Sequence, residues 1–318
     1  MKKILVTGAC GLIGKIICSS LLEKGNVVIG TDESEEGFNS GKPGYTFIKA
    51  GPHHIPTFKK IFREEHFDTV IHCACTVDND LENIVTEDNM DYSADYDDFL
   101  YMMAKDAGVK QFILLSTSAV YELPKSREPI REDDKLNLES NYAKLKYDAE
   151  RALSFSLRNQ KEMIGAALRI APIYTSDYTD NLINKILDKE TNNLFVYHSG
   201  DYGFQFCCLY NLVEFILCFI SMAKDYSYTG VYNIADDNIV SAREIIKFAR
   251  QRKTYGPVLQ RKVNIDILKN KINLLRKRNE IKEDYRYNDI DVYFNNNMLD
   301  GTKSKKIYTS KWSIDNTK

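Results

Sequence analysis

A glycine-rich stretch near the N-terminus constrains the fold of this chain more than any other feature. The segment KKILVTGACGLIGKIIC, residues 2–18, sets Gly8, Gly11 and Gly14 three residues apart, after a short apolar run and before a run with helical periodicity. Glycines at this spacing allow a tight turn and let backbone N–H groups approach a ligand closely. The segment therefore predicts a strand, a turn and a helix whose N-terminus can receive a phosphate.

Short β-rich runs alternate with helical runs over the first half of the chain. Strands that alternate with helices and are apolar throughout are typical of a parallel sheet that is covered on both faces. We therefore expect an α/β fold, a doubly wound parallel sheet of the Rossmann type, with its ligand at the carboxyl ends of the strands. The expected strands are 3–8, 26–32, 68–74, 111–117 and 164–171, and the expected helices are 12–24, 56–65, 83–106 and 140–158.

An acidic residue at the end of the second expected strand indicates the ligand. Asp32 follows Gly14 by 18 residues, where a carboxylate can accept hydrogen bonds from the adenosine ribose of a dinucleotide. A carboxylate there repels a 2′-phosphate, and no arginine stands beside it to accept one. The pattern therefore predicts NAD, in preference to NADP, as the cofactor. The residues expected to hold it are Gly8, Gly11, Leu12, Ile13, Gly14 and Asp32.

The alternation of elements becomes less regular beyond about residue 175, where Asn, Tyr and Lys are frequent. We expect an NAD-binding Rossmann domain at 1–174 and a smaller, interleaved substrate-binding lobe at 175–318, with about 205–250 returning to the Rossmann domain. The run 269–282 is strongly basic. We interpret it as a solvated helix face, and the alternative is that one or two of its side chains contact a phosphate.

Charge and apolar content argue against two classes of partner. The formal net charge of −2 supplies no overall field that would attract nucleic acid or an anionic membrane, so we expect neither. The apolar stretch 212–223 is too short to span a bilayer and contains Glu214. We expect it to be a buried helix.

The seven cysteines are scattered, and no C-x-x-C pair occurs among them. This pattern favours reduced thiols and a cytoplasmic location. The sequence IHCAC at 71–75 sets a histidine beside two cysteines, which leaves a metal site as one interpretation. Because alternate strand residues point to opposite faces, we expect an apolar strand and no metal.

The glycine spacing from Thr7 to Gly14 resembles the TGxxGxxG signature of the short-chain dehydrogenase/reductase superfamily. That resemblance requires a Tyr-x-x-x-Lys pair on a helix, and NYAKLK supplies Tyr142 and Lys146. Four residues apart, the two side chains share one helix face, so the ammonium can lie near the phenol. Lowering the pKa of a phenol from ~10 to near 7 takes ~4 kcal/mol, which Lys146 and a positive nicotinamide ring can supply together. The alternative is a surface helix with an incidental pair.

Further segments match a narrower pattern: DTVIHCA, Asn89, STSAVY, EPIREDD, ALRIAPIY and GVYNIADDNIVSAREI. They make nearly the whole chain similar to the extended branch of that superfamily, the NAD-dependent nucleotide-sugar epimerases and dehydratases of the UDP-glucose 4-epimerase type. The resemblance implies that Thr117 hydrogen-bonds the reacting sugar oxygen, that Tyr142 is the acid/base and that Lys146 holds the nicotinamide ribose. It adds Cys73 and Ala74, with Tyr142 and Lys146, to the NAD contacts. It implies substrate contacts for Thr76, Asn89, Ser118, Pro172 and Phe204.

The chain departs from the family pattern at several positions. Ser118 and Ala119 stand where the dehydratases have the Asp and Glu that eliminate water, so 4,6-dehydration is disfavoured. Phe204 lies about where the family usually has an arginine for the nucleotide diphosphate, and Pro172 replaces the usual Asn. Gly51 falls where the family often has an Asp that contacts adenine.

The function implied by the resemblance is that of an enzyme of carbohydrate biosynthesis, an NAD-dependent epimerase of a nucleotide-activated sugar. Tyr142 would remove a hydroxyl proton while hydride passes to NAD⁺, and hydride would return to the opposite face of the keto-sugar. Two alternatives stay open: an NAD(P)-dependent reductase or dehydrogenase of a keto-sugar or related polyol, and a non-catalytic dinucleotide-binding member of the fold. We expect a homodimer built on the helices around 83–106 and 140–158.

Overall fold

The computed structural model describes residues 1–34, 39–75, 87–122, 128–138, 140–158, 160–261 and 298–317, with the backbone alone for 87–93. The chain divides into two compact units, each built from segments that are far apart in the sequence. The first unit comprises Met1–Val120, Asn141–Arg169 and Val213–Tyr232, and the second comprises Tyr121–Ser140, Ile170–Leu212 and Asn233–Lys318.

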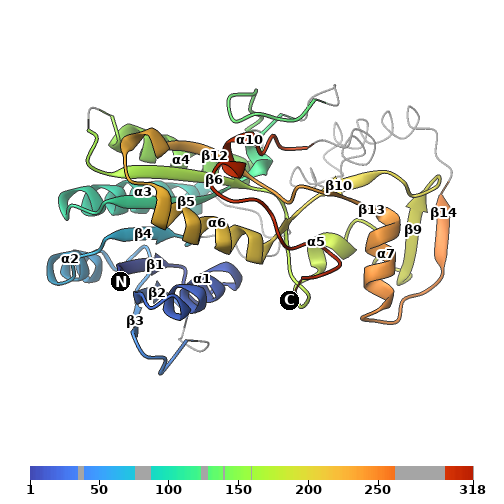
Figure 1. Cartoon of the computed structure of the whole chain (residues 1–318), viewed down its shortest axis with the longest axis horizontal. Helices are drawn as coiled ribbons and strands as arrows, with labels where there is room; N and C mark the ends of the chain where they lie inside the picture. The colour runs from blue at the N-terminus through green and yellow to red at the C-terminus, as the bar shows by residue number, and fades with distance from the viewer. Residues whose placement is uncertain are drawn as a thin grey trace. The chain divides into compact units, whose positions relative to one another are not determined.

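A seven-stranded sheet is the framework of the fold (Figure 1), with the strand order β12-β6-β5-β4-β1-β2-β3. β1 pairs in parallel with β2 and β4, β2 with β3, and β4 with β5. This arrangement confirms the predicted doubly wound parallel sheet. Its strands are β1 (Lys3–Thr7), β2 (Val27–Asp32), β3 (Tyr45–Lys49), β4 (Thr69–His72), β5 (Gln111–Thr117), β6 (Ile164–Ile170) and β12 (Gly230–Ile234).

Helices cover both faces of this sheet. Side chains of α2, α3 and α4, such as Phe58, Leu100 and Leu153, form one buried cluster with strand residues that include Leu5. Ile4 and Val6 alternate with Leu5, so they point to the other face, and they are fully buried too. Burial on both faces explains why the strands read as continuous apolar runs. The helices are α1 (Leu12–Glu23), α2 (Ile55–Glu64), α3 (Glu87–Asp106), α4 (Asn141–Ser156) and α6 (Leu209–Met222).

The expected elements of the first half are confirmed with small shifts at their ends, and the buried helix expected at 212–223 is α6. The expected helix at 83–106 is described from Glu87. The sequence pattern does not predict β3, which lies at the edge of the sheet and is only partly buried. An edge strand is only partly buried, so it lacks the continuous apolar run by which the other strands were predicted. The aromatic and β-branched residues of YTFIK could have indicated a strand.

The second unit contains short strands around its own apolar cluster, to which Tyr174, Leu194, Phe206 and Ile245 contribute. β10 pairs antiparallel with β13, β11 pairs in parallel with β7, and β9 lies between β14 and β8. Ser241 and Glu244 form a capping box that starts α7. The elements are β7 (Ile173–Tyr174), α5 (Asp180–Ile183), β8 (Leu187–Asp188), β9 (Asn193–Tyr197), β10 (Gly203–Gln205), β11 (Cys207–Cys208), β13 (Ile239–Ser241), α7 (Ala242–Arg250), β14 (Val258–Arg261) and α10 (Thr302–Lys305).

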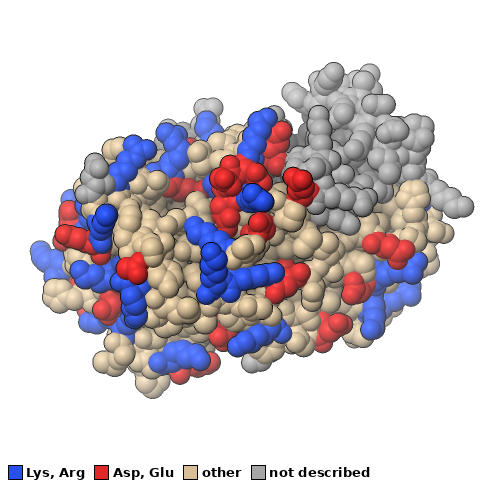
Figure 2. Space-filling view, turned by 45° about the horizontal axis from the view of Figure 1, so that its top comes forward, with Lys and Arg blue, Asp and Glu red and all other residues tan. Residues whose placement is uncertain are grey.

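The charged side chains on the face in Figure 2 are of mixed sign, with Lys and Arg interspersed among Asp and Glu over the described residues. Among the helices that the structure describes, none has both the length and the apolar character needed to cross a membrane.

A buried ion pair fixes α4 to the sheet. The Arg169 guanidinium of β6 donates two hydrogen bonds to Glu150 Oε2, from Nη2 at 2.7 Å and from Nε at 3.1 Å, and both side chains are 4% exposed. The Ser116 hydroxyl of β5 donates to the other carboxylate oxygen at 2.5 Å. Because charge-assisted, bidentate contacts are strongly directional, this network sets the orientation of α4 against β5 and β6.

Replacing Glu150 with Gln should lower the free energy of unfolding by about 3 kcal/mol, because it leaves the Arg169 charge buried without a carboxylate. Urea denaturation followed by circular dichroism measures the loss. Glu162→Gln, at an exposed position before β6, is the control and should change the free energy of unfolding by less than about 0.5 kcal/mol. Equal, small losses in the two variants would contradict the structural role of the pair.

Candidate active site

The turn between β1 and α1 is closed by Gly8 and Gly14. Gly8 has a φ of +68°, and a Cβ there would lie 2.7 Å from the backbone nitrogen of Ala74. A Cβ on Gly14 would lie 2.0 Å from the carbonyl oxygen of Gly8. Backbone atoms cannot move aside as a flexible side chain can, so both positions exclude a side chain. The fold itself therefore requires these two glycines.

Gly11 differs from both, because the protein leaves room for a Cβ there. Its backbone is extended (φ −67°, ψ 166°), and among the residues that the structure describes a Cβ would meet only the Gly8 carbonyl oxygen, at an ordinary 3.4 Å. No side chain caps α1 at this residue, and the first turn of the helix has no acidic residue. A bare, uncapped helix start fits the pyrophosphate of a dinucleotide, which the N–H groups of Leu12 and Ile13 would hold.

Asp32 is fixed at the end of β2 by two backbone N–H groups. Cys10, in the glycine turn, donates to its Oδ2 at 2.9 Å, and Ser34 donates to its Oδ1 at 2.9 Å. The Glu33 side chain lies over Gly51, where a Cβ would come within 2.4 Å of its Oε1. Two carboxylates at this edge of the sheet repel a 2′-phosphate, so the residues present fit NAD better than NADP.

A buried chain of polar contacts supports Cys73 and Ala74, which follow β4. Thr7 Oγ1 lies 2.6 Å from His72 Nδ1, and His72 Nε2 lies 2.7 Å from Asp97 Oδ1. The Ala74 N–H donates to Thr7 Oγ1 at 3.4 Å. Both ring nitrogens of His72 therefore have partners within the protein, which accounts for this histidine without a metal.

Thr117 and Ser118 lie where β5 ends, at the edge of the sheet where a ligand is expected. Thr117 is buried, and its hydroxyl accepts a hydrogen bond from the Ala119 N–H at 3.2 Å. Ser118 is partly exposed and begins a single 3₁₀ turn, η1 (Ser118–Val120). The turn leaves two hydroxyl-bearing residues together at this edge.

Tyr142 and Lys146 lie one turn apart on α4. The Lys146 ammonium is buried and donates to the Leu115 carbonyl of β5 at 3.1 Å. Burial lowers the pKa of Lys146, but the neighbouring Cys75, Tyr142 and Asp97 outweigh burial, so the pKa is raised overall. Lys146 is therefore charged at neutral pH, and its charge favours the ionised form of a neighbouring phenol.

Pro172 and Phe204 belong to the second unit. The Pro172 carbonyl accepts a hydrogen bond from β11 at 3.0 Å. Phe204 is buried, its ring packs edge to face with Tyr202, and the Lys185 ammonium lies 5.6 Å from its ring centre. Burial lowers the pKa of Lys185 to about 7. Phe204 thus lies in an aromatic core beside a buried amine.

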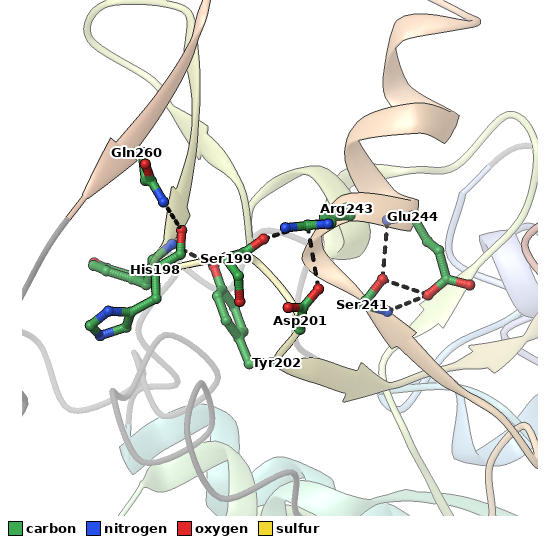
Figure 3. A network of polar contacts seen from close by, with 9 residues as sticks. His198, Ser199, Asp201, Tyr202, Ser241, Arg243, Glu244 and Gln260 are labelled. Carbon is green, nitrogen blue, oxygen red and sulfur yellow. Dashed lines mark hydrogen bonds and ion pairs between the residues drawn. The ribbon is translucent and has the colours of Figure 1, made fainter.

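The loop that leads into β10 is held by α7 (Figure 3). Arg243 donates to the Ser199 carbonyl and lies 3.4 Å from the Asp201 carboxylate. Gln260 of β14 donates to the His198 carbonyl from the other side. These contacts fix the backbone from which the Phe204 side chain projects.

Two of the expected substrate contacts cannot be placed. Thr76 lies outside the described residues. The basic run 269–282, for which a phosphate contact was the alternative interpretation, lies outside them too. Asn89 lies on α3, where the structure describes the backbone alone.

Three residues of the site were not recognised from the sequence. Glu150 follows Tyr142 and Lys146 at the same four-residue spacing, and that periodicity could have identified it. Asp97 and Cys75 interact with Lys146 only because α3 and the segment after β4 fold against α4. Cys75 stands between the expected contacts Ala74 and Thr76, and that position could have identified it, whereas no signal in the sequence marks Asp97.

Comparison with known proteins gives one family match. The model of the NAD dependent epimerase/dehydratase family matches residues 4–235. A UDP-glucose 4-epimerase of Streptomyces lividans is 30% identical over 124 residues, which is 38% of each chain. A UDP-glucuronate 4-epimerase of Thermodesulfobacterium geofontis is 27% identical over 187 residues, 54% of this chain and 55% of the relative. The chain thus matches about half or less of the length of these curated relatives.

Solved structures with the same fold include two epimerases. The UDP-Glc/GlcNAc 4-epimerase of Campylobacter jejuni superimposes with a TM-score of 0.75 at 17% identity, covering 99% of this chain and 96% of the other. The UDP-glucose 4-epimerase of Thermotoga maritima, solved with UDP-glucose, gives a TM-score of 0.72 at 21% identity, covering 98% and 95%. Both likenesses confirm the predicted fold class.

Replacing Gly11 with Ala should keep the melting temperature within about 3 °C of the native protein and weaken NAD binding at least tenfold (about 1.4 kcal/mol), because the methyl group fits the protein and obstructs the pyrophosphate. Thermal unfolding and calorimetric titration with NAD measure the two effects.

Two further variants complete the comparison. Gly14→Ala should lower the melting temperature by more than about 10 °C, because its Cβ collides with Gly8. Gly301→Ala is the matched control, since its Cβ would also meet its nearest atom at 3.4 Å, and it should bind NAD normally. Unchanged NAD affinity in Gly11→Ala would contradict the assignment of this turn to the cofactor.

Proposed function

Because the chain belongs to the NAD dependent epimerase/dehydratase family, we propose that it is an NAD-dependent epimerase of a nucleotide-activated sugar, acting through transient oxidation to a keto-sugar. The observation that carries this proposal is the charged Lys146 ammonium beside Tyr142, held at the end of β5 by the Leu115 carbonyl. The relatives support the substrate class, because both are named as 4-epimerases of UDP-linked sugars.

Each of the site residues in the first unit has a proposed role in this reaction. Bound NAD would supply the redox chemistry, by accepting a hydride from the sugar and returning it. Tyr142 takes the proton of the reacting hydroxyl and gives it back, and Thr117 hydrogen-bonds the same oxygen. Lys146 holds the nicotinamide ribose and stabilises the ionised phenol. The cofactor is held by Gly8, Gly11, Leu12, Ile13, Gly14, Asp32, Cys73 and Ala74.

We assign substrate binding mainly to the second unit, with Pro172 and Phe204 as contacts, together with Ser118 from the first unit. The protein is proposed to act in the cytoplasm, which is supported by its cysteines, since none of the seven is in a disulfide.

A homodimer formed through α3 and α4 is part of the proposal. The support is a pair of large apolar side chains on these helices, Met102 at 50% exposure and Phe155 at 70% exposure. A contiguous exposed apolar patch is typical of a surface that a partner covers, and we infer that these two side chains belong to one.

Phe155→Glu should convert the dimer into a monomer, because a carboxylate on the helix face cannot be buried in the interface. Sedimentation velocity at micromolar concentration measures the mass. Met222→Glu, which changes an exposed methionine on α6 (41% exposed), should leave the dimer intact. A native protein that sediments as a monomer contradicts the proposed assembly.

Tyr142→Phe should reduce epimerisation at least about a hundredfold, because the phenol that transfers the proton is lost. The purified protein is incubated with NAD and UDP-glucose or UDP-glucuronic acid, and the sugars are separated by chromatography. Tyr147→Phe, on the same helix, is the matched control and should keep native activity.

Two results would contradict the proposal. One is a Tyr142→Phe variant that retains most of the turnover. The other is stoichiometric formation or consumption of NADH without interconversion of epimers, which is the behaviour of a one-way dehydrogenase or reductase.

A further inference from the structure

A buried chain of hydrogen bonds joins helix α3 to the glycine turn. His72 Nε2 lies 2.7 Å from Asp97 Oδ1, and His72 Nδ1 lies 2.6 Å from Thr7 Oγ1. Thr7 and His72 are partners in the parallel pairing of β1 with β4, so their side chains project from the same face of the sheet. All three residues are buried. The Asp97–His72–Thr7 relay thus runs from α3, across the end of β4, to the residue that precedes Gly8.

The positions of the protons in the relay follow from the partners of each group. A carboxylate only accepts hydrogen bonds, so His72 Nε2 carries the proton that faces Asp97. The Ala74 N–H donates to Thr7 Oγ1 at 3.4 Å. Of the two partners of the Thr7 hydroxyl, only His72 Nδ1 can accept, so the single hydroxyl proton points to that nitrogen. In this arrangement each donor of the relay has one acceptor.

Asp97 decides which nitrogen of His72 is protonated. With the proton on Nδ1, the lone pair of Nε2 would face the carboxylate oxygen 2.7 Å away, and two acceptors at that distance repel each other. Nδ1 would then donate to Thr7, and the Thr7 hydroxyl would lose its acceptor. The rings of Tyr96 and Phe112 pack edge to face against the imidazole, at 5.6 and 6.3 Å between ring centres, and restrict its rotation. The carboxylate and the ring packing together fix the tautomer and the orientation of His72.

The other end of the relay holds the backbone that follows β4. Thr7 receives two N–H groups from this backbone: Cys73 donates to its carbonyl at 3.2 Å, and Ala74 donates to its hydroxyl. Gly8 packs so closely against Ala74 that a Cβ on Gly8 would lie 2.7 Å from the Ala74 nitrogen. The direction of the Thr7 hydroxyl therefore affects the segment to which we assign contacts with the cofactor.

We propose that Asp97 and His72 are positioning residues for the cofactor, which act through the Thr7 hydroxyl to hold Cys73 and Ala74 against the glycine turn. This inference rests on the proposed function, because it takes Cys73 and Ala74 as contacts of NAD. Asp97 thereby contributes to NAD affinity, although His72 and Thr7 separate it from the segment that contacts the cofactor.

The adjacent strand provides a matched control for Thr7. Thr31 is the partner of Thr7 in the pairing of β1 with β2, and both residues are 1% exposed. The Thr31 hydroxyl has no hydrogen-bond partner among the residues that the structure describes. A valine at either position replaces the hydroxyl with a methyl group of similar size, so the two substitutions differ in the hydrogen bonds that they remove.

Calorimetric titration of the whole chain with NAD alone measures the contribution of the hydroxyl. Thr7→Val should weaken NAD binding about fivefold to tenfold, the scale of one hydrogen bond. Thr7→Ser, which keeps the hydroxyl, and Thr31→Val should both bind NAD within about twofold of the native protein. The amide proton of Ala74, followed by NMR, should exchange faster with solvent in Thr7→Val and at the native rate in Thr31→Val.

A double-mutant cycle tests whether Asp97 acts through Thr7. Asp97→Leu should weaken NAD binding about fivefold in the native protein and by less than about twofold when Thr7 is already valine, because the hydroxyl that the relay directs is then gone. A purely structural contact would give additive losses. Long-range ¹H–¹⁵N spectra add a spectroscopic readout: His72 should be protonated at Nε2 in the native protein and should be a mixture of both tautomers in Asp97→Leu.

Four results overturn the inference: native NAD affinity in Thr7→Val, an equal loss in Thr31→Val, a proton on Nδ1 of neutral His72 in the native protein, or additive losses in the double variant. The Thr7 variants remove no charge, so they test the inference even if Asp97→Leu does not fold. None of these measurements involves a sugar. If the variants bind NAD as expected and no sugar is epimerised, the proposed function fails and the positioning role stands.

Discussion

The buried pair of Arg169 and Glu150 is the interaction on which the geometry of the first unit depends. It joins β6 to α4, and the Ser116 hydroxyl brings the end of β5 into the same network. Glu150 lies four residues after Lys146, which lies four residues after Tyr142, so fixing Glu150 orients the helix face that carries the other two side chains. The cost of removing the two charges from water offsets much of the attraction between them. The main contribution of this pair is therefore the directional contact that orients α4 against the sheet. The side chains of Tyr142 and Lys146 are thus oriented by a contact that α4 makes with the sheet through Glu150.

The three glycines of the turn serve two purposes: Gly8 and Gly14 are required by the fold, and Gly11 is assigned to the cofactor. A side chain on Gly8 would collide with Ala74, and one on Gly14 would collide with Gly8, whereas the described part of the chain leaves room for a methyl group on Gly11. The packing of Gly8 against Ala74 also ties the turn to the segment after β4. The shape of the cofactor site and the surroundings of Lys146 are therefore two consequences of one set of backbone contacts.

Much of this architecture could be predicted from local patterns. The glycine spacing, the alternation of apolar strands with helices and the Tyr-x-x-x-Lys spacing led to the parallel sheet and to an NAD-dependent family, and both predictions were confirmed. The strand β3 was missed, because an edge strand buries too little surface to leave an apolar run. The roles of Thr117, Tyr142 and Phe204 stay predictions, and Thr76 lies outside the described residues. Phe204, expected to contact substrate, is buried beside Lys185, a contact that no spacing in the sequence indicates.

The sequence by itself determined the features that depend on residues a few positions apart: the tight turn before α1, the shared face of Tyr142 and Lys146, and the burial of the central strands. Only the tertiary structure decided which distant residues meet. β4 lies between β1 and β5 in the sheet, so the segment after β4 reaches both the glycine turn and the lysine of α4. Cys75 beside Lys146, Arg169 against Glu150 and Glu33 over Gly51 all follow from strand order and helix packing. The separation of these segments along the chain does not indicate their distance in space. They come together because folding buries the apolar faces of the sheet under the helices.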